Sequence, residues 1–145
     1  MTVNIVKLCV GCESVDDLAK WQKARLAQMR RRNPKARLSH VTRSMPKRAD
    51  EVLDGGSLFW VIKGYVRVRQ RIIGLRAVRG EEGASACAIE LAPRLIKTQL
   101  VAWRPFQGWR YLEAEDAPPD LPKRSPGDDD LPPKLAAALR ELGLL

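Results

Sequence analysis

The most regular hydrophobic pattern in the chain lies at residues 58–73. Residues 58–62 are apolar at every position and rich in β-branched and aromatic side chains, which is typical of a strand covered on both faces. After Gly64, apolar and polar residues alternate. Because successive strand side chains point to opposite faces, we expect Val66 and Val68 on a core-facing side. The opposite side should then present a basic face, made of Tyr65, Arg67, Arg69 and Arg71.

Two further patterns predict helices. Apolar residues at helical spacing form one stripe over residues 15–32, including Leu18, Trp21 and Leu26. Ser14, followed three residues later by an aspartate, resembles a capping box at the start of this helix. A shorter helix is expected between residues 44 and 56, with a proline in its first turn and a glycine just past its end.

The remaining apolar segments read as short strands. Residues 4–10, 84–91 and 96–103 show strand patterns separated by turn signals, and crossover helices between the last of them are missing. The sequence therefore predicts an α+β domain at residues 1–112. In this domain a curved, mostly antiparallel sheet packs against one long N-terminal helix, with a short second helix.

The composition changes at residue 113. Residues 113–145 hold six prolines between positions 118 and 133, and 8 acidic against 4 basic residues. We interpret this segment as a Pro-rich acidic tail that ends in a short helix from Pro133. Such a tail could fold back on a basic surface, bind a protein partner, or stay solvated.

Overall composition places the chain among soluble proteins of one domain. It has 145 residues, 45% of them apolar, and no apolar run long enough for a membrane span. The N-terminus lacks the features of a signal peptide. Three cysteines, an odd number, argue against a disulfide framework and fit a reducing compartment. We expect a cytoplasmic protein without membrane contact.

The net charge of +9 is concentrated in one part of the chain. Residues 20–80 hold 17 Lys and Arg against 3 Asp and Glu. Concentrated positive charge is typical of proteins that bind a polyanion, although solubility alone is a competing explanation.

An aromatic run at residues 103–112 adds to this picture. It holds four aromatic side chains interleaved with arginines. Aromatic and guanidinium planes together can stack and clamp unpaired bases, a role that would fall to Trp109 and Arg110. The alternative is that the aromatic residues close the core, which we favour for Phe106.

The cysteines admit three interpretations. Cys9-x-x-Cys12 between a strand and a helix superficially resembles a thioredoxin-like redox pair. Together with His40 and Cys87 it would instead complete a tetrahedral zinc site. We favour buried free cysteines, and predict neither a metal nor another cofactor. No Ser-His-acid or paired-carboxylate pattern is legible, so no catalytic residue is predicted.

Two segments carry a family resemblance. Pro46–Gly64 (PKRADEVLDGGSLFWVIKG) and Arg104–Leu112 (RPFQGWRYL) resemble a family of short bacterial proteins catalogued only as a domain of unknown function. This resemblance implies no activity. In architecture, a short helix ending in glycine before a basic strand is also similar to the pseudo-barrels of PUA and ASCH RNA-binding domains, a likeness at the level of fold alone.

These observations favour non-catalytic binding of nucleic acid, RNA above all, through the basic face. The expected phosphate contacts, which position a strand without reading its sequence, come from Arg43, Lys47, Arg48 and Lys63. One alternative is a protein-interaction module that uses residues 113–145. Another is an enzyme on a small phosphorylated substrate, which would need a deep pocket lined by the same arginines.

Overall fold

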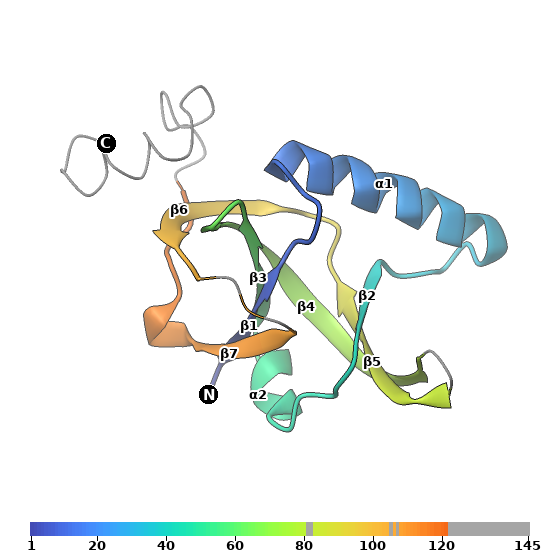
Figure 1. Cartoon of the computed structure of the whole chain (residues 1–145). Helices are drawn as coiled ribbons and strands as arrows, with labels where there is room; N and C mark the ends of the chain where they lie inside the picture. Colours follow the sequence, from blue (N-terminus) through green and yellow to red (C-terminus); the bar gives the residue numbers. More distant parts are fainter. Residues whose placement is uncertain (81–82, 105, 107, 122–145) are drawn as a thin grey trace.

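The computed structural model describes residues 1–80, 83–104, 106 and 108–121 (Figure 1). Its elements are β1 (Val3–Leu8), α1 (Val15–Arg32), β2 (Ser39–Thr42), α2 (Ala49–Leu53), β3 (Ser57–Ile62), β4 (Tyr65–Arg79), β5 (Ser85–Leu91), β6 (Ile96–Ala102), β7 (Trp109–Glu113) and the short 3-10 helix η2 (Ala114–Asp116). The α+β class is therefore confirmed.

The strands form one mixed, seven-stranded sheet that does not close into a barrel. Their order is β2-β5-β4-β3-β1-β7, and β6 pairs with β4 beside this path. All pairings between these strands are antiparallel except that of β1 with β3. Parallel neighbours need a crossover connection, and here α1, β2 and α2 lie on that connection. In Figure 1, α1 lies over one end of the sheet and α2 at the opposite end.

Strand β4 links the two halves of the sheet. Its first residues pair with β3 and β6, whereas its second half pairs with β5. A register shift between Ile72 and Gly74 separates these halves. Such bulges bend a strand and increase its twist, so β4 turns the corner between them and gives the sheet its curvature.

Residues 58–73, which carry the most regular hydrophobic pattern, form two paired strands, β3 and the start of β4. Ile62 pairs with Tyr65 across a two-residue turn, in which Lys63 has φ 50° and Gly64 has φ 82°. Two successive positive φ values are the requirement of a type I′ hairpin turn, which glycine meets without steric cost. The glycine therefore closes a hairpin.

The predicted alternation of β4 is wrong at its start. Trp60 pairs with Val68, but the next residue of β3, Val61, pairs with Val66, so Arg67 is an extra residue in a bulge. A bulge shifts the side-chain parity of a strand. Val66 and Val68 consequently belong to different hydrophobic clusters on opposite faces of the sheet.

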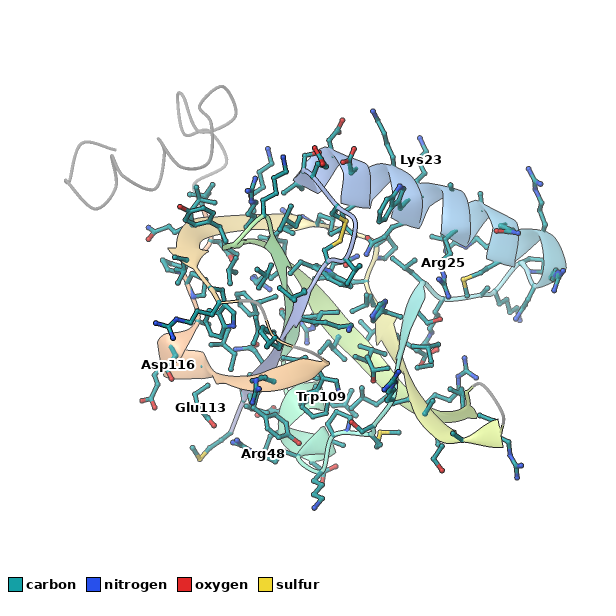
Figure 2. All side chains as sticks on the ribbon, viewed as in Figure 1. Lys23, Arg25, Arg48, Trp109, Glu113 and Asp116 are labelled. Carbon is teal, nitrogen blue, oxygen red and sulfur yellow. A yellow bond between two sulfur atoms is a disulfide. The ribbon has the colours of Figure 1, made fainter. Side chains whose placement is uncertain are left out.

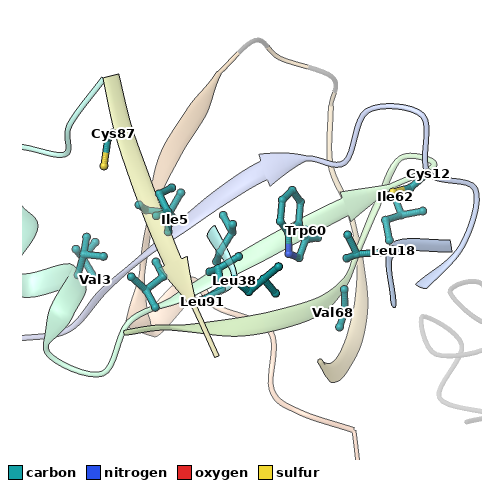
Figure 3. Packing of buried hydrophobic residues seen from close by; sticks show 14 residues of the cluster. Val3, Ile5, Cys12, Leu18, Leu38, Trp60, Ile62, Val68, Cys87 and Leu91 are labelled. Carbon is teal, nitrogen blue, oxygen red and sulfur yellow. The ribbon is translucent and has the colours of Figure 1, made fainter. Parts of the chain in front are cut away.

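Those two clusters explain why β3 is buried at all six positions. The larger one gathers residues of β1, β3, β4 and β5 around Trp60 (Figure 3). The smaller one lies on the other face and contains Phe59 and Val61, against which Trp103 and Phe106 pack. The interpretation of Phe106 as a core-closing residue is confirmed.

Helix α1 has the predicted bounds, Val15–Arg32, but packs less closely than expected. The Ser14 hydroxyl caps it by accepting the Asp17 backbone N–H at 3.1 Å. Leu18 is its buried residue, whereas Trp21, placed by the sequence pattern in the apolar stripe, is 51% exposed. A pocket therefore lies between the helix and the sheet.

The shorter helix begins later than predicted. Helix α2 starts at Ala49, because the preceding residues form a turn in which the backbone N–H of Arg48 donates to the Tyr111 hydroxyl at 3.0 Å. Gly55, with φ 85°, follows its end as expected.

Ordered contacts continue past residue 112. The backbone N–H of Gln99 donates to Pro119, and that of Leu121 donates to Lys97, so residues 119–121 lie along β6. The predicted C-terminal helix and most of the acidic tail lie outside the described residues. Within the described part of the chain, no helix is long and apolar enough to cross a membrane.

Candidate functional site

Arg67, at the centre of the predicted basic face, is buried. Only 8% of its surface is exposed, and its Nε–H donates to the Ile62 carbonyl oxygen at 2.7 Å. Burial lowers the pKa of its guanidinium. The expectation that this side chain is exposed is therefore wrong, and the cause is the bulge that takes it out of the alternation of β4.

Arg69 is engaged by a residue of the predicted tail. Its guanidinium forms two hydrogen bonds with the Asp120 carboxylate, at 2.7 and 2.8 Å, and a third with the Ser57 hydroxyl at 2.9 Å. This bidentate pairing, a strong form of charge-assisted hydrogen bond, lowers the pKa of Asp120. A phosphate could reach Arg69 only by displacing Asp120.

Arg48 is engaged in the same way. It forms ion pairs with Glu51 on its own helix and with Glu113 at the end of β7, the latter at 2.7 Å (Figure 2). Its guanidinium also lies 5.2 Å from the ring centre of Tyr111. The hydrogen bonds to Glu51 and Glu113 raise its pKa above the ordinary value. Arg48 thus fixes β7 against α2.

The other predicted contacts are dispersed. Lys63, in the hairpin turn, pairs with Glu13 at 3.2 Å, and the Tyr65 ring centre lies 6.0 Å from the Arg67 guanidinium. Exposed cations remain at scattered positions of the chain, namely Arg43, Lys47, Arg71 and Arg110. The structure therefore does not assemble a continuous basic face along β4.

A groove lies where the sheet is open, between β2 and β7. It has a volume of about 870 Å³ and is lined by side chains from β1, the end of β2 and the segment before β7. Lys7 and Arg43 supply its cations, and Trp109 and Phe106 its aromatic rings. Among the described residues, no carboxylate forms an ion pair with Lys7 or Arg43, in contrast to Arg48 and Arg69.

Trp109 is held in one orientation at the rim of this groove. Its ring packs edge-on against Tyr111, with ring centres 4.9 Å apart, and its indole N–H donates to the Ser44 carbonyl at 3.3 Å. These contacts bridge the open edge between β7 and the segment after β2. Beside it, the exposed Arg110 guanidinium lies 5.6 Å from the Phe106 ring centre.

A second pocket, of about 260 Å³, lies between α1 and the sheet. Trp21 and Arg25 line it from the helix, and Trp60 and His40 line it from the strands. Lys7 borders both this pocket and the groove, so the two spaces are adjacent.

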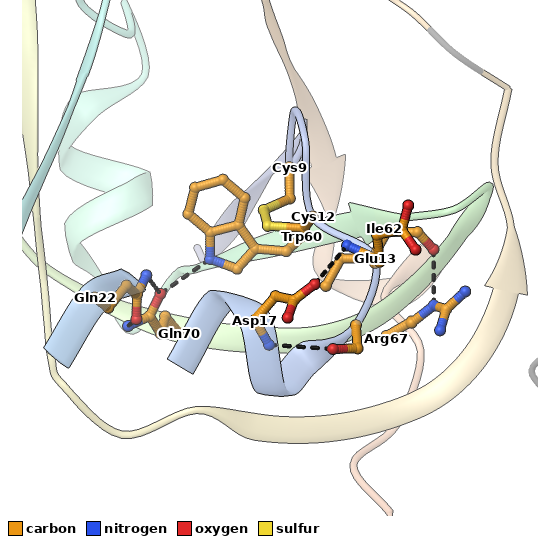
Figure 4. The surroundings of a disulfide bond; sticks show 10 residues. Cys9, Cys12, Glu13, Asp17, Gln22, Trp60, Ile62, Arg67 and Gln70 are labelled. Atoms are coloured by element: carbon orange, nitrogen blue, oxygen red, sulfur yellow. Dashed lines mark hydrogen bonds between the residues drawn. A yellow bond between two sulfur atoms is a disulfide. The ribbon is translucent and has the colours of Figure 1, made fainter. Parts of the chain in front are cut away.

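Hydrogen bonds fix the inner wall of the pocket (Figure 4). The side-chain oxygen of Gln70, a fully buried residue of β4, accepts from the Trp60 indole N–H at 2.9 Å and from the Gln22 amide at 2.8 Å. The Gln70 amide donates in turn to the Gln22 side chain at 2.7 Å. This network ties α1 to the sheet and holds Trp60 in place.

His40 is the unsatisfied polar group of the pocket. Its Nε2 is buried and has no hydrogen-bond partner among the described residues, while its ring packs edge-on against Trp60 at 5.2 Å. Burial, together with the nearby charges of Lys7 and Arg25, lowers its pKa to about 4. The imidazole is therefore neutral at pH 7, with one ring nitrogen able to donate and the other to accept.

The predicted zinc set does not assemble. Cys9 and Cys12 form a disulfide beside Trp60 (Figure 4), whereas Cys87 is buried near the Met45 sulfur, 3.5 Å away. No group of three potential ligands occurs among the described residues. The favoured interpretation, buried free cysteines, therefore holds for Cys87 and is wrong for the other pair, because residues 9–12 turn tightly enough to bring the two sulfurs together.

A family model described as Protein of unknown function (DUF1489) matches residues 5–145. The chain belongs to this family. The resemblance inferred from Pro46–Gly64 and Arg104–Leu112 is thus confirmed. No curated protein and no solved structure matches the chain.

Sequence reasoning missed several residues that line the two spaces of this DUF1489 protein: Lys7, Trp21, Arg25 and Trp60. Lys7 did leave a signal, since it is the one charged residue of strand β1. Trp21 and Trp60 were interpreted as parts of apolar patterns, and Arg25 was not singled out, because a pocket between elements distant in sequence has no local pattern.

Proposed function

We propose that the protein binds RNA, or another single-stranded nucleic acid, without catalysing a reaction. The observation that supports this most is the open groove, in which Lys7 and Arg43 lie beside Trp109 and have no carboxylate partner within the described part of the chain. Cations that track a backbone next to aromatic rings that stack on bases are the usual equipment for single strands. The proposed interface therefore lies at the opening of the sheet, whereas the sequence pattern predicted it on the face of β4.

The proposed interface retains part of the set expected from sequence. Arg43 and Trp109 line the groove, and the exposed Lys47 and Arg110 lie on the segments that flank it.

We also propose a pseudo-barrel of the PUA and ASCH kind. The curvature at β4 and the opening between β2 and β7 support it. A cytoplasmic location belongs to the same proposal.

The first test is whether the purified full chain carries nucleic acid, followed by anisotropy measurements with labelled single-stranded RNA at several salt concentrations. Each lost phosphate contact reduces the salt slope for single strands by about 0.7. The double variant Lys7→Gln/Arg43→Gln should therefore bind more weakly, with a slope lower by about 1.4. Its matched control is Arg76→Gln/Arg79→Gln, two exposed cations at the far end of β4.

Equal losses in both double variants would indicate nonspecific attraction to net charge and would overturn the groove as the interface. Absence of binding by the wild-type chain at low salt would overturn RNA binding altogether. The interaction-module alternative would then gain support from a protein partner that is lost when residues 122–145 are removed.

A further inference from the structure

The pocket between α1 and the sheet has the dimensions of a site for a small planar group. Its volume of about 260 Å³ lies just below the range of roughly 300–1,000 Å³ that is common for drug-sized ligands. Three aromatic rings line it, from Trp21, His40 and Trp60. A single aromatic ring system fits such a space, whereas a longer chain of linked rings does not.

The walls are held before any ligand binds. Trp60 is only 3% exposed, and Gln70 fixes its indole N–H. Gln22 joins the same network from α1. The helix that covers the pocket is therefore hydrogen-bonded to the sheet. Preorganised walls reduce the ordering cost of binding. Trp21, in contrast, is half-exposed at the outer side of the pocket.

The polar groups of the pocket complement a nucleotide. The buried Nε2 of His40 lacks a hydrogen-bond partner among the residues that the structure describes, and unsatisfied groups of this kind are rare in folded proteins. Nucleobase edges carry both donors and acceptors. Lys7 and Arg25 supply positive charge for a phosphate, and none of the described residues that line the pocket carries a carboxylate. Figure 2 shows Arg25 on the side of α1 that faces the sheet.

We propose that this pocket binds one nucleotide unit, with its base against Trp21, Trp60 and the His40 edge, and its phosphate between Lys7 and Arg25. The inference rests on the proposed RNA binding and names the part of the ligand that is recognised. Because Lys7 borders both spaces, a strand lying in the groove could place one unpaired base in the pocket. A free nucleotide offers the same chemistry.

The test titrates the full chain with the four ribonucleoside 5′-monophosphates, with inorganic phosphate, and with a short single-stranded RNA. Indole N–H signals in NMR spectra report on the tryptophans. Trp21→Ala should weaken nucleotide or RNA binding at least about fivefold, the lower end for loss of one base–aromatic stack. Ile73→Ala, which removes another exposed apolar side chain, should leave affinity unchanged.

A second pair of variants tests the positive charge that Arg25 supplies to the pocket. Arg25→Ala should weaken binding, whereas Arg31→Ala, on the same helix but outside the pocket, should not. Both residues are exposed, so neither change threatens folding. Lys7 is avoided in this series because it borders both spaces.

The outcomes separate the two proposals. Monophosphate binding that depends on Trp21 and Arg25 supports the pocket with a free nucleotide as a sufficient ligand. The same dependence with RNA alone supports a base presented by a strand. If both variants bind RNA normally while Arg43→Ala, which changes the groove alone, does not, the pocket proposal is overturned and the groove remains. If the wild-type chain binds neither ligand, both proposals fail.

Discussion

The start of β4 and the opening of the sheet are both rich in cations, but the surroundings of those cations differ. At the start of β4, Arg67 is buried on a backbone carbonyl and Arg69 is paired with Asp120. At the opening, Lys7 and Arg43 line a groove, and no carboxylate pairs with either of them among the described residues. Hence the same residue types stabilise the fold in one region and remain available to a ligand in the other.

The difference shows that a run of cations in sequence does not by itself locate a binding surface. Besides the nearby Glu51, Arg48 pairs with a carboxylate from residue 113, and Arg69 pairs with one from residue 120. Both of these distant carboxylates lie more than fifty positions further along the chain. An anionic ligand at either arginine must compete with a carboxylate already in place. An arginine or lysine without such a partner binds an anion at lower cost.

The largest expected effect is on the hydrogen-bond network that holds Trp60 and Gln22 in the pocket wall. Gln70→Ala leaves the Trp60 indole N–H unpaired and opens a cavity in a fully buried position. We expect the free energy of unfolding to fall by about 2–4 kcal/mol, measured by urea denaturation. Gln99→Ala, at an exposed position of β6, is the control and should change stability little. An equal effect at both positions would contradict the assigned network.

The next largest expected effect is the dependence of folding stability on pH. The pKa of His40 is about 4 in the folded state, against 6.5 for an ordinary histidine, so the unfolded chain binds more protons between these pH values. Stability that is complete above pH 6.5 should therefore decrease as the pH falls toward 4, by up to about 3 kcal/mol. Denaturation of the wild-type chain and of His40→Asn across this range measures it. A variant with the same pH dependence as the wild type would refute the assignment to His40.

A smaller loss of stability is expected at the bulge of β4. Arg67→Met keeps an apolar stem but removes the hydrogen bond to the Ile62 carbonyl, which should lower the free energy of unfolding by about 1–2 kcal/mol. Arg71→Met, at an exposed position, should stay within about 0.5 kcal/mol of the wild type. If Arg67→Met instead weakened RNA binding with unchanged stability, that result would support RNA binding by the basic face that the sequence predicts on β4.

The smallest expected effect is on RNA affinity, compared between an arginine of the groove and an arginine at the start of β4. Arg43→Ala should weaken RNA binding several-fold and lower the salt slope by about 0.7. Arg69→Ala should leave affinity close to that of the wild type, because Asp120 already occupies this guanidinium. Anisotropy titrations of both variants decide the point. A reversed order would place the interface at the start of β4.

Local patterns predicted most of the elements. The apolar run at residues 58–62 became a strand buried on both faces, and the capping and apolar spacing near Ser14 gave the exact bounds of α1. These features depend on residues a few positions apart, which a sequence displays directly. The antiparallel character of most of the sheet also followed from the short spacings between strands.

The site was less predictable, because it depends on contacts between distant segments. A single extra residue at Arg67 reversed the side-chain parity of β4, and nothing in the alternating pattern marks where a bulge occurs. Gln22 and Gln70, which hold the pocket together, are 48 positions apart. Two glutamines with no special spacing carry no local signal.

The sequence by itself determined the class of fold, the main strands and helices, the family and the excess of positive charge. The tertiary structure decided which cations are neutralised, because Glu113 and Asp120 reach Arg48 and Arg69 only after the chain folds back on itself. It also decided where the sheet stays open, because β2 and β7 lie at the two ends of the strand order. Local patterns arise from neighbouring residues, whereas charge pairing and open grooves arise from the packing of remote ones.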